Sequence, residues 1–190
     1  MSTVVAVKKG SEICIASESL TTFGSTKVQH QYISNPEKIL KWGDSYIGTT
    51  GMVTLQMMLS DIIKKEKKKP DFSNIPAIYD YFNRLHVKLK NKYFLKPEED
   101  EEDPVESSQI ELVIVNKHGI FSVHSLREVY QFEKFWAYGS GTRFALGAMH
   151  AVYDLKGYSA EQIAVAGVQA GITFDDGSGG EIVTKVISLK

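Results

Sequence analysis

The sequence predicts an α+β fold in which two sheets pack together and a pair of helices covers each sheet. The order of predicted elements is strands, two helices, strands, two helices and a final strand, and strands in two blocks favour this layering. With 190 residues, 43% of them hydrophobic, the chain can bury a sizeable core, so one domain over residues 1–190 is expected. Periodicity supports the elements, but it does not by itself establish the stacking of four layers.

The first block of strands lies before residue 50. Runs of apolar and β-branched residues, separated by turn residues, predict strands over 3–9, 12–17, 28–34, 38–41 and 45–49. Gly10 separates the first two strands, as in a hairpin, and Gly43-Asp44 marks the turn before the last one.

Two helices are predicted next. The first, over 52–65, carries apolar residues at helical spacing and lysines at its end, where cations suit the helix dipole. The second begins at Ser73-Asn74, before Pro76, and its apolar stripe consists of Ile78, Phe82, Leu85 and Leu89.

Residues 97–108 form an acidic stretch flanked by proline. We expect a solvated loop, which is the usual state of such a run of charges. The alternative is a docking patch for a basic partner.

The second block begins after this loop. Strands are predicted over 110–115, 120–124 and 129–138, then a helix over 141–155 that stops before Gly157. Ser159 and Gln162 form a capping box that opens a helix to about residue 172. A glycine-rich loop over 175–180 leads into a last strand over 181–188.

Composition narrows the class of protein. The net charge of −1 implies no general affinity for nucleic acid or for an anionic membrane. The single cysteine, Cys14, rules out an intrachain disulfide, and neither a signal peptide nor a membrane-spanning apolar run is evident, so a cytoplasmic protein is expected. The five histidines show no metal-ligand spacing, so neither a metal nor another cofactor is expected.

The start of the chain offers a candidate nucleophile. Met1 precedes Ser2, which is small enough for the initiator methionine to be trimmed. Trimming would leave a hydroxyl beside a free α-amine whose pKa is about 8, at the start of a strand. One residue would then supply both nucleophile and base, as in N-terminal-nucleophile enzymes.

Six short motifs follow one another along the chain. They are Ser-Thr-Val-Val-Ala-Val at 2–7, Ala-Ser-Glu-Ser at 16–19 running to Thr-Phe-Gly at 22–24, Glu-Lys-Ile at 37–39, Ile-Gly at 47–48, Tyr-Gly-Ser-Gly at 138–141, and Asp-Asp-Gly-Ser-Gly-Gly at 175–180. In this order and spacing they resemble the motifs of proteasome β-type subunits, and most closely those of the bacterial proteasome-like peptidase HslV. The likeness covers nearly the whole chain and is weakest over 67–108.

The resemblance implies a four-layer αββα sandwich of two antiparallel sheets, the N-terminal nucleophile hydrolase fold. It implies a threonine-type peptidase that hydrolyses peptides or unfolded proteins inside a self-compartmentalised homo-oligomeric ring. An ATPase unfoldase is the further partner that the family suggests.

The resemblance also assigns roles to residues. Ser2 would be the nucleophile, Lys38 would act on it by charge, and Glu18 would hold Lys38. The Gly48 N–H would face the oxyanion, and Ser140, Asp175 and Ser178 would surround the α-amine. Thr22 and Thr50 would bind the substrate backbone, and Tyr46 would form a wall of the pocket for the side chain before the cleaved bond.

Two residues depart from the family pattern. Ser2 stands where the family has threonine, and Glu18 stands where it has aspartate. The extra methylene of Glu18 is expected to shift Lys38 or weaken their pairing. Two alternatives stay open: a non-catalytic scaffold subunit of the same fold, and an amidase of the same fold that acts on a small molecule.

Overall fold

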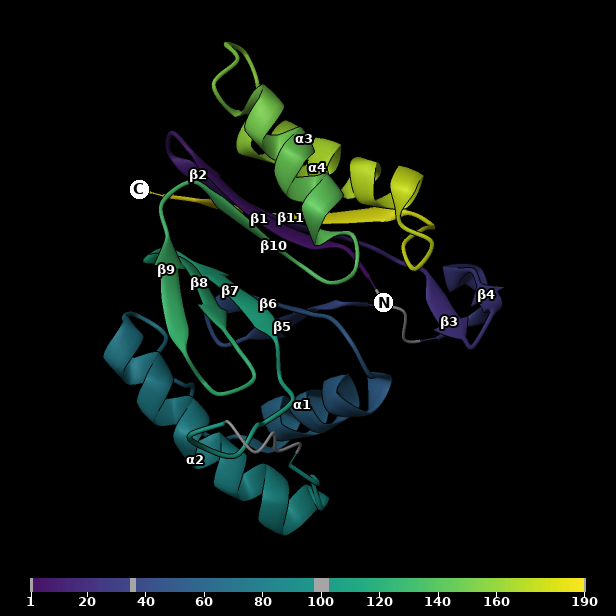
Figure 1. The fold of residues 1–190 in the computed structure, drawn as a ribbon. Helices are drawn as coiled ribbons and strands as arrows, with labels where there is room; N and C mark the ends of the chain where they lie inside the picture. The colour runs from purple at the N-terminus through teal and green to yellow at the C-terminus, as the bar shows by residue number, and fades with distance from the viewer. Residues whose placement is uncertain (1, 35–36, 98–102, 190) are drawn as a thin grey trace.

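The structure is a computed structural model that describes residues 2–34, 37–97 and 103–189. Two sheets face each other, and one pair of helices covers the outer side of each (Figure 1). The α+β sandwich predicted from the sequence is therefore confirmed. Met1, whose removal is predicted, lies outside the described residues, as does the centre of the acidic loop, residues 98–102.

Among the described residues, four strands form the first sheet in the order β10-β1-β2-β11, with all neighbours antiparallel. These strands are β1 (Val4–Lys9), β2 (Glu12–Glu18), β10 (Phe135–Tyr138) and β11 (Ile182–Ser188). β1 is thus an interior strand, with β2 on one side and β10 on the other. Ser2, the predicted nucleophile, lies two residues before this interior strand.

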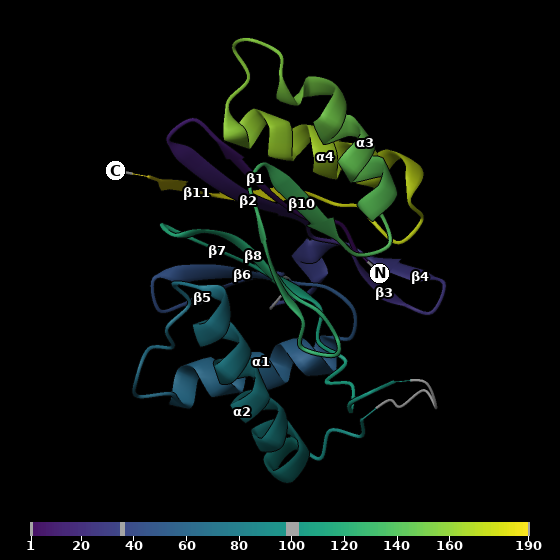
Figure 2. The ribbon, with the colours of Figure 1, turned by 60° about the vertical axis from the view of Figure 1, so that its left-hand side comes forward.

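The second sheet contains five of the described strands, in the order β5-β6-β7-β8-β9, and is also antiparallel. Its strands are β5 (Ile39–Trp42), β6 (Ser45–Thr49), β7 (Leu112–Asn116), β8 (Gly119–Val123) and β9 (Val129–Phe132). A separate short hairpin pairs β3 (Thr21–Phe23) with β4 (Thr26–Val28). Figures 1 and 2 show this hairpin projecting at the end of the sandwich where the N-terminus lies.

The helices form the two outer layers (Figure 2). α1 (Val53–Lys65) and α2 (Ile75–Tyr93) cover the five-stranded sheet, and α3 (Thr142–Tyr153) and α4 (Ala160–Phe174) cover the four-stranded one. Side chains of β1 alternate between two cores: Val4 and Ala6 lie between the sheets, whereas Val5 and Val7 pack under α3 and α4. Burial on both faces explains why β1 is apolar at successive positions.

Both helix starts predicted from capping residues are confirmed. Asn74 Oδ1 accepts a hydrogen bond of 3.0 Å from Ala77 N at the start of α2. Ser159 and Gln162 form the reciprocal capping box of α4, which ends with Asp175 as its C-cap. The capping box therefore fixes the start of α4, and Asp175, a candidate site residue, lies at the other end of this helix.

Two strand predictions are wrong in part. The run over 129–138 is two strands in different sheets, because the charged pair Glu133-Lys134 makes the crossing and Lys134 O accepts from Lys8 N at 2.7 Å. The run over 28–34 instead contains a 3₁₀ turn, His30–Tyr32, whose local hydrogen bonds replace sheet pairing. No helix in the described ranges is both long and apolar enough to cross a bilayer.

Candidate active site

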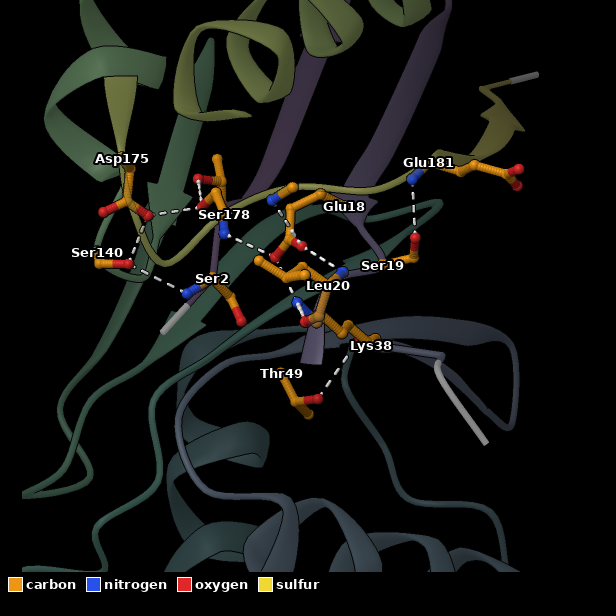
Figure 3. Close-up of polar contacts among 12 residues, drawn as sticks. Ser2, Glu18, Ser19, Leu20, Lys38, Thr49, Ser140, Asp175, Ser178 and Glu181 are labelled. Carbon is orange, nitrogen blue, oxygen red and sulfur yellow. Dashed lines mark hydrogen bonds and ion pairs between the residues drawn. The ribbon is translucent and has the colours of Figure 1, made fainter. Parts of the chain in front are cut away.

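A pocket of about 460 Å³ opens beside Ser2, between the β3–β4 hairpin and the start of α1. Its lining includes Ser2, Leu20, Thr21, Thr22, Phe23, Ile33, Lys38, Thr49, Thr50 and residues 51–54. Figure 3 shows Ser2 between two polar groups, one formed by Ser140, Asp175 and Ser178 and the other by Lys38 and Glu18.

The Ser2 backbone is fixed on both sides of its Cα atom. Ser2 N donates to Ser140 Oγ at 3.2 Å, and Ser2 O accepts from Gly141 N at 3.3 Å. Gly139 has a φ of +99°, and a Cβ on it would lie 2.0 Å from Ser2 O, so this position requires glycine. In the full-length chain the Ser2 nitrogen belongs to a peptide bond, and removal of Met1 would make it an α-amine.

Asp175 accepts hydrogen bonds from two hydroxyl groups beside the Ser2 nitrogen. Ser140 Oγ and Ser178 Oγ each donate to Asp175 Oδ2 at 2.7 Å. Ser178 N also donates to Asp175 O at 3.2 Å, which closes the turn after α4. The three residues that the resemblance assigns to the shell of the α-amine therefore form one hydrogen-bonded group (Figure 3).

Glu18 and Lys38 form a buried ion pair on the other side of Ser2. Lys38 Nζ contacts Glu18 Oε1 and donates to Leu20 O at 2.7 Å. The carboxylate of Glu18 also accepts from Thr3 N at 3.2 Å, Leu20 N at 2.7 Å and Gly179 N at 3.3 Å. The longer acid thus reaches Lys38 directly, so the extra methylene does not prevent their pairing.

Burial lowers the pKa of the Lys38 amine, and the neighbouring carboxylate of Glu18 opposes that shift. Lys38 also lines the pocket, so a largely desolvated lysine lies beside the place where a substrate could bind. Thr49 fixes its backbone, because Thr49 N and Thr49 Oγ1 both donate to Lys38 O, at 2.9 and 3.2 Å. A lysine of this kind can assist deprotonation of a nearby group.

Of the predicted substrate-binding residues, Thr22 and Thr50 line the pocket. Tyr46 and Gly48 are not among its lining residues. The Tyr46 ring lies 4.0 Å from Lys41 Nζ, and Gly48 lies within β6, where an added Cβ would meet Val4 Cγ1 at 2.4 Å. The close approach of the two sheets thus gives Gly48 a structural reason to be glycine.

Sequence reasoning did not single out Thr3, Leu20 or Thr49. Thr3 is fully buried; its N–H contacts Glu18 and its hydroxyl lies 2.7 Å from Ser178 Oγ. The available signal was a threonine directly before the apolar strand that starts at Val4. Leu20 acts through its backbone N–H and C=O, which leave no mark on residue type, whereas Thr49 uses both its backbone N–H and its hydroxyl. In the described part of the chain, no cluster of His, Cys, Asp and Glu could hold a metal ion.

A four-layer sandwich with a buried serine two residues before an interior strand is the architecture of the N-terminal nucleophile hydrolases. The family model of proteasome subunits matches residues 1–187, and the chain belongs to that family. The comparison with curated proteins finds no match.

Solved structures of similar proteins agree with this family assignment. BPH from Thiobacillus denitrificans is 39% identical, with a TM-score of 0.93 and coverage of 99% of this chain and 98% of that one. BPH in complex with epoxomicin is 38% identical, with the same TM-score and 99% of each chain covered. Eukaryotic HslV from Trypanosoma brucei, at 21% identity, TM-score 0.67 and coverage of 98% and 99%, shares the fold. The family supports a peptidase of the N-terminal-nucleophile type.

Proposed function

We propose that this chain is a proteasome-type peptidase whose nucleophile is Ser2 after removal of Met1. The observation that carries the proposal is the position of Ser2: its nitrogen is held by Ser140, and it lines the same pocket as the buried Lys38. A hydroxyl, an amine and a desolvated lysine then surround the place where a peptide carbonyl would bind.

In the proposed reaction the Ser2 α-amine accepts the hydroxyl proton, directly or through a water, as Oγ attacks the carbonyl carbon. The C–N bond then breaks, and the leaving amine takes a proton back from the α-ammonium. This leaves an ester between Ser2 and the acyl half of the peptide, which water hydrolyses with the same amine as base. The Gly48 backbone N–H is our candidate donor to the oxyanion.

Lys38 and Glu18 act on the nucleophile through charge. The Lys38 ammonium favours the ionised form of a neighbouring hydroxyl, and its lowered pKa lets the amine exchange a proton more readily than an exposed lysine does. Glu18 holds the amine in place through their ion pair.

The relatives support the wider setting of this activity. Since BPH, at 38% identity, is seen in complex with epoxomicin, we expect epoxomicin to occupy the pocket of this chain as well. Proteasome-type proteins form rings and act on peptides or unfolded proteins, with ATPases as partners. We propose a homo-oligomeric ring of this kind in the cytoplasm.

The buried Lys38–Glu18 pair beside the pocket favours a peptidase over a scaffold subunit. A scaffold has no use for a buried lysine paired with a buried acid at a pocket, because burying such a pair is costly. The β3–β4 hairpin, whose strand β3 lines the pocket, offers a strand edge to which a peptide backbone can pair, which favours peptides over small amides.

The test is the mass and the activity of the intact protein. We expect a mass lower by one methionine, hydrolysis of a short fluorogenic peptide, and inhibition by epoxomicin. Ser2→Ala should lose hydrolysis while keeping the fold, whereas Ser11→Ala, at an exposed turn, should keep it. Retained Met1 with no turnover would favour the scaffold, and turnover of small amides alone would favour the amidase.

A further inference from the structure

We propose that Thr3 is a positioning residue for the reaction, acting through Ser178 and Asp175 on the nitrogen of Ser2. The inference rests on the proposed function of Ser2 as an N-terminal nucleophile. Thr3 lies next to the nucleophile in the chain, but its side chain acts at the far end of the hydrogen-bonded group that holds Ser2.

The hydrogen bonds of this group have a fixed direction. Ser178 has one hydroxyl proton, and it goes to Asp175 Oδ2 at 2.7 Å. In the 2.7 Å contact between Thr3 Oγ1 and Ser178 Oγ, Thr3 must therefore be the donor. A donated bond from Thr3 fills the lone-pair side of Ser178 and keeps the Ser178 proton directed at the carboxylate.

The same reasoning applies on the other side of Asp175. Ser140 gives its proton to Asp175 Oδ2, so Ser140 Oγ is left as an acceptor for Ser2 N. Two series of donors, one from Thr3 and one from Ser2, thus meet at one carboxylate oxygen. Once Met1 is removed, this hydrogen bond would hold one N–H of the α-amine, and in the proposed reaction the lone pair of the same nitrogen accepts the Ser2 hydroxyl proton.

The surroundings confine the Thr3 hydroxyl to this geometry. Thr3 is fully buried, and a Cβ placed on Gly141 or on Gly171 would lie 1.9 or 2.2 Å from Thr3 Oγ1. Two glycines on different helices therefore leave space for this one hydroxyl. The Thr3 N–H donates to Glu18, so the residue joins the Asp175 group to the Lys38–Glu18 pair.

The experiment compares Thr3→Ala with Thr3→Ser, two variants that differ in the hydroxyl and that both fit the space of threonine. Turnover is measured per trimmed chain, with the trimmed fraction taken from intact mass. Thr3→Ala should lower kcat about tenfold, the kinetic equivalent of one hydrogen bond, with KM changed less than twofold. Thr3→Ser should stay within threefold of the parent protein.

A double-mutant cycle with Ser178→Ala tests the route of the effect. If Thr3 acts through Ser178, Thr3→Ala should cause no further loss of kcat in the Ser178→Ala background, whereas independent roles would multiply. The matched control is Thr184→Val, which removes a threonine hydroxyl from the same sheet away from the site and should leave kcat unchanged.

Three outcomes would overturn the inference: equal kcat for the Ala and Ser variants, multiplicative losses in the cycle, or loss of stability with no change in kcat per folded chain. Failure of the proposed function looks different, because Ser2→Ala would then keep its activity. Parent-like turnover of Thr3→Ala beside an inactive Ser2→Ala would reject the role of Thr3 alone.

Discussion

At the scale of single residues, the buried carboxylate of Glu18 connects segments that are far apart in the sequence. It contacts Lys38 of the β5 entry, Thr3 at the start of β1 and Gly179 of the loop after α4. Because backbone N–H groups are among these donors, removing one partner leaves the carboxylate still hydrogen-bonded. Substitution of one of these partners should therefore lower activity more than it lowers the free energy of unfolding.

Lys38→Ala tests that expectation. We expect activity to fall at least 100-fold while the free energy of unfolding falls by about 1–3 kcal/mol, since Glu18 keeps three N–H donors. Lys38→Arg should also be inactive, because the wider guanidinium does not fit a position that is 9% exposed.

Peptide turnover and urea denaturation measure the two quantities. Lys41→Ala, on the exposed side of the same strand, is the control and should change neither. Parent-like rates in Lys38→Arg would show that the compact amine is not required.

Cys14 gives a prediction at a residue outside the site. Its thiol is fully buried, and burial raises the pKa of that thiol to about 12. At pH 8 roughly one thiol in ten thousand is then ionised, so iodoacetamide should leave the native protein unmodified and label it fully in denaturant. Rapid labelling of the folded protein, seen by mass, would contradict the burial of β2.

The family resemblance proposed part of the site and not the rest. Ser2 was a candidate from its place at the start of the chain, and Lys38, Ser140, Asp175 and Ser178 could be proposed because they lie in the motifs that carry the resemblance. Leu20 could not, since it contributes its backbone N–H and C=O to Glu18 and Lys38. Whether Tyr46 reaches the pocket depends on which way β6 presents its alternating side chains, and motif order does not contain that information.

At the scale of elements, the start of α3 is built around the first residues of β1. Gly141, the N-cap of α3, lies so close to Thr3 that a Cβ would come within 1.9 Å of its hydroxyl. Gly147, six residues further along the same helix, has no neighbour within 4 Å of an added Cβ. One helix thus offers a glycine that packing requires and another that it does not.

Two substitutions in α3 should therefore have opposite effects. Gly141→Ala should lower the free energy of unfolding by more than about 2 kcal/mol and abolish turnover, because Thr3 must move. Gly147→Ala should raise it by about 0.5–1 kcal/mol and leave turnover unchanged, because alanine favours the helix. Urea denaturation of both variants decides; a neutral Gly141→Ala would mean that the contact with Thr3 is loose.

The elements were predictable where their own residues determine them. Helices α1, α2 and α4 follow from apolar spacing and from capping residues, and their observed starts agree with the predicted ones. The crossing at Glu133-Lys134 was missed because most of residues 129–138 are strand-like. β9 pairs with the neighbouring β8, whereas β10 pairs in the other sheet with β1, more than a hundred residues earlier in the chain. Local pattern cannot show which sheet a strand joins.

At the scale of the whole molecule, α1 presents apolar side chains on both of its faces. Leu55, Leu59 and Ile62 are buried against the five-stranded sheet, while Met57 remains 60% exposed. An apolar outer face on a surface helix is characteristic of a protein contact. It agrees with the ring assembly that we propose.

Light scattering at micromolar concentration tests the assembly. We expect a mass that is a multiple of the 21.2 kDa chain, and we expect Met57→Glu to lower it by placing a charge in the contact. Lys64→Glu, an exposed charge change on the same helix, is the comparison. A mass near 21 kDa for the parent protein would exclude the ring.

The interior position of β1 also determines when the protein can become active. Ser2 is 4% exposed, and the strand that follows it is hydrogen-bonded on both sides. An aminopeptidase needs an extended, accessible chain end, and Ser2 is buried, so under the proposed mechanism we expect Met1 to be removed before the chain folds. A chain that folds first would keep its methionine and remain a dormant subunit, so the trimming rate during synthesis would determine how many working sites each assembly contains.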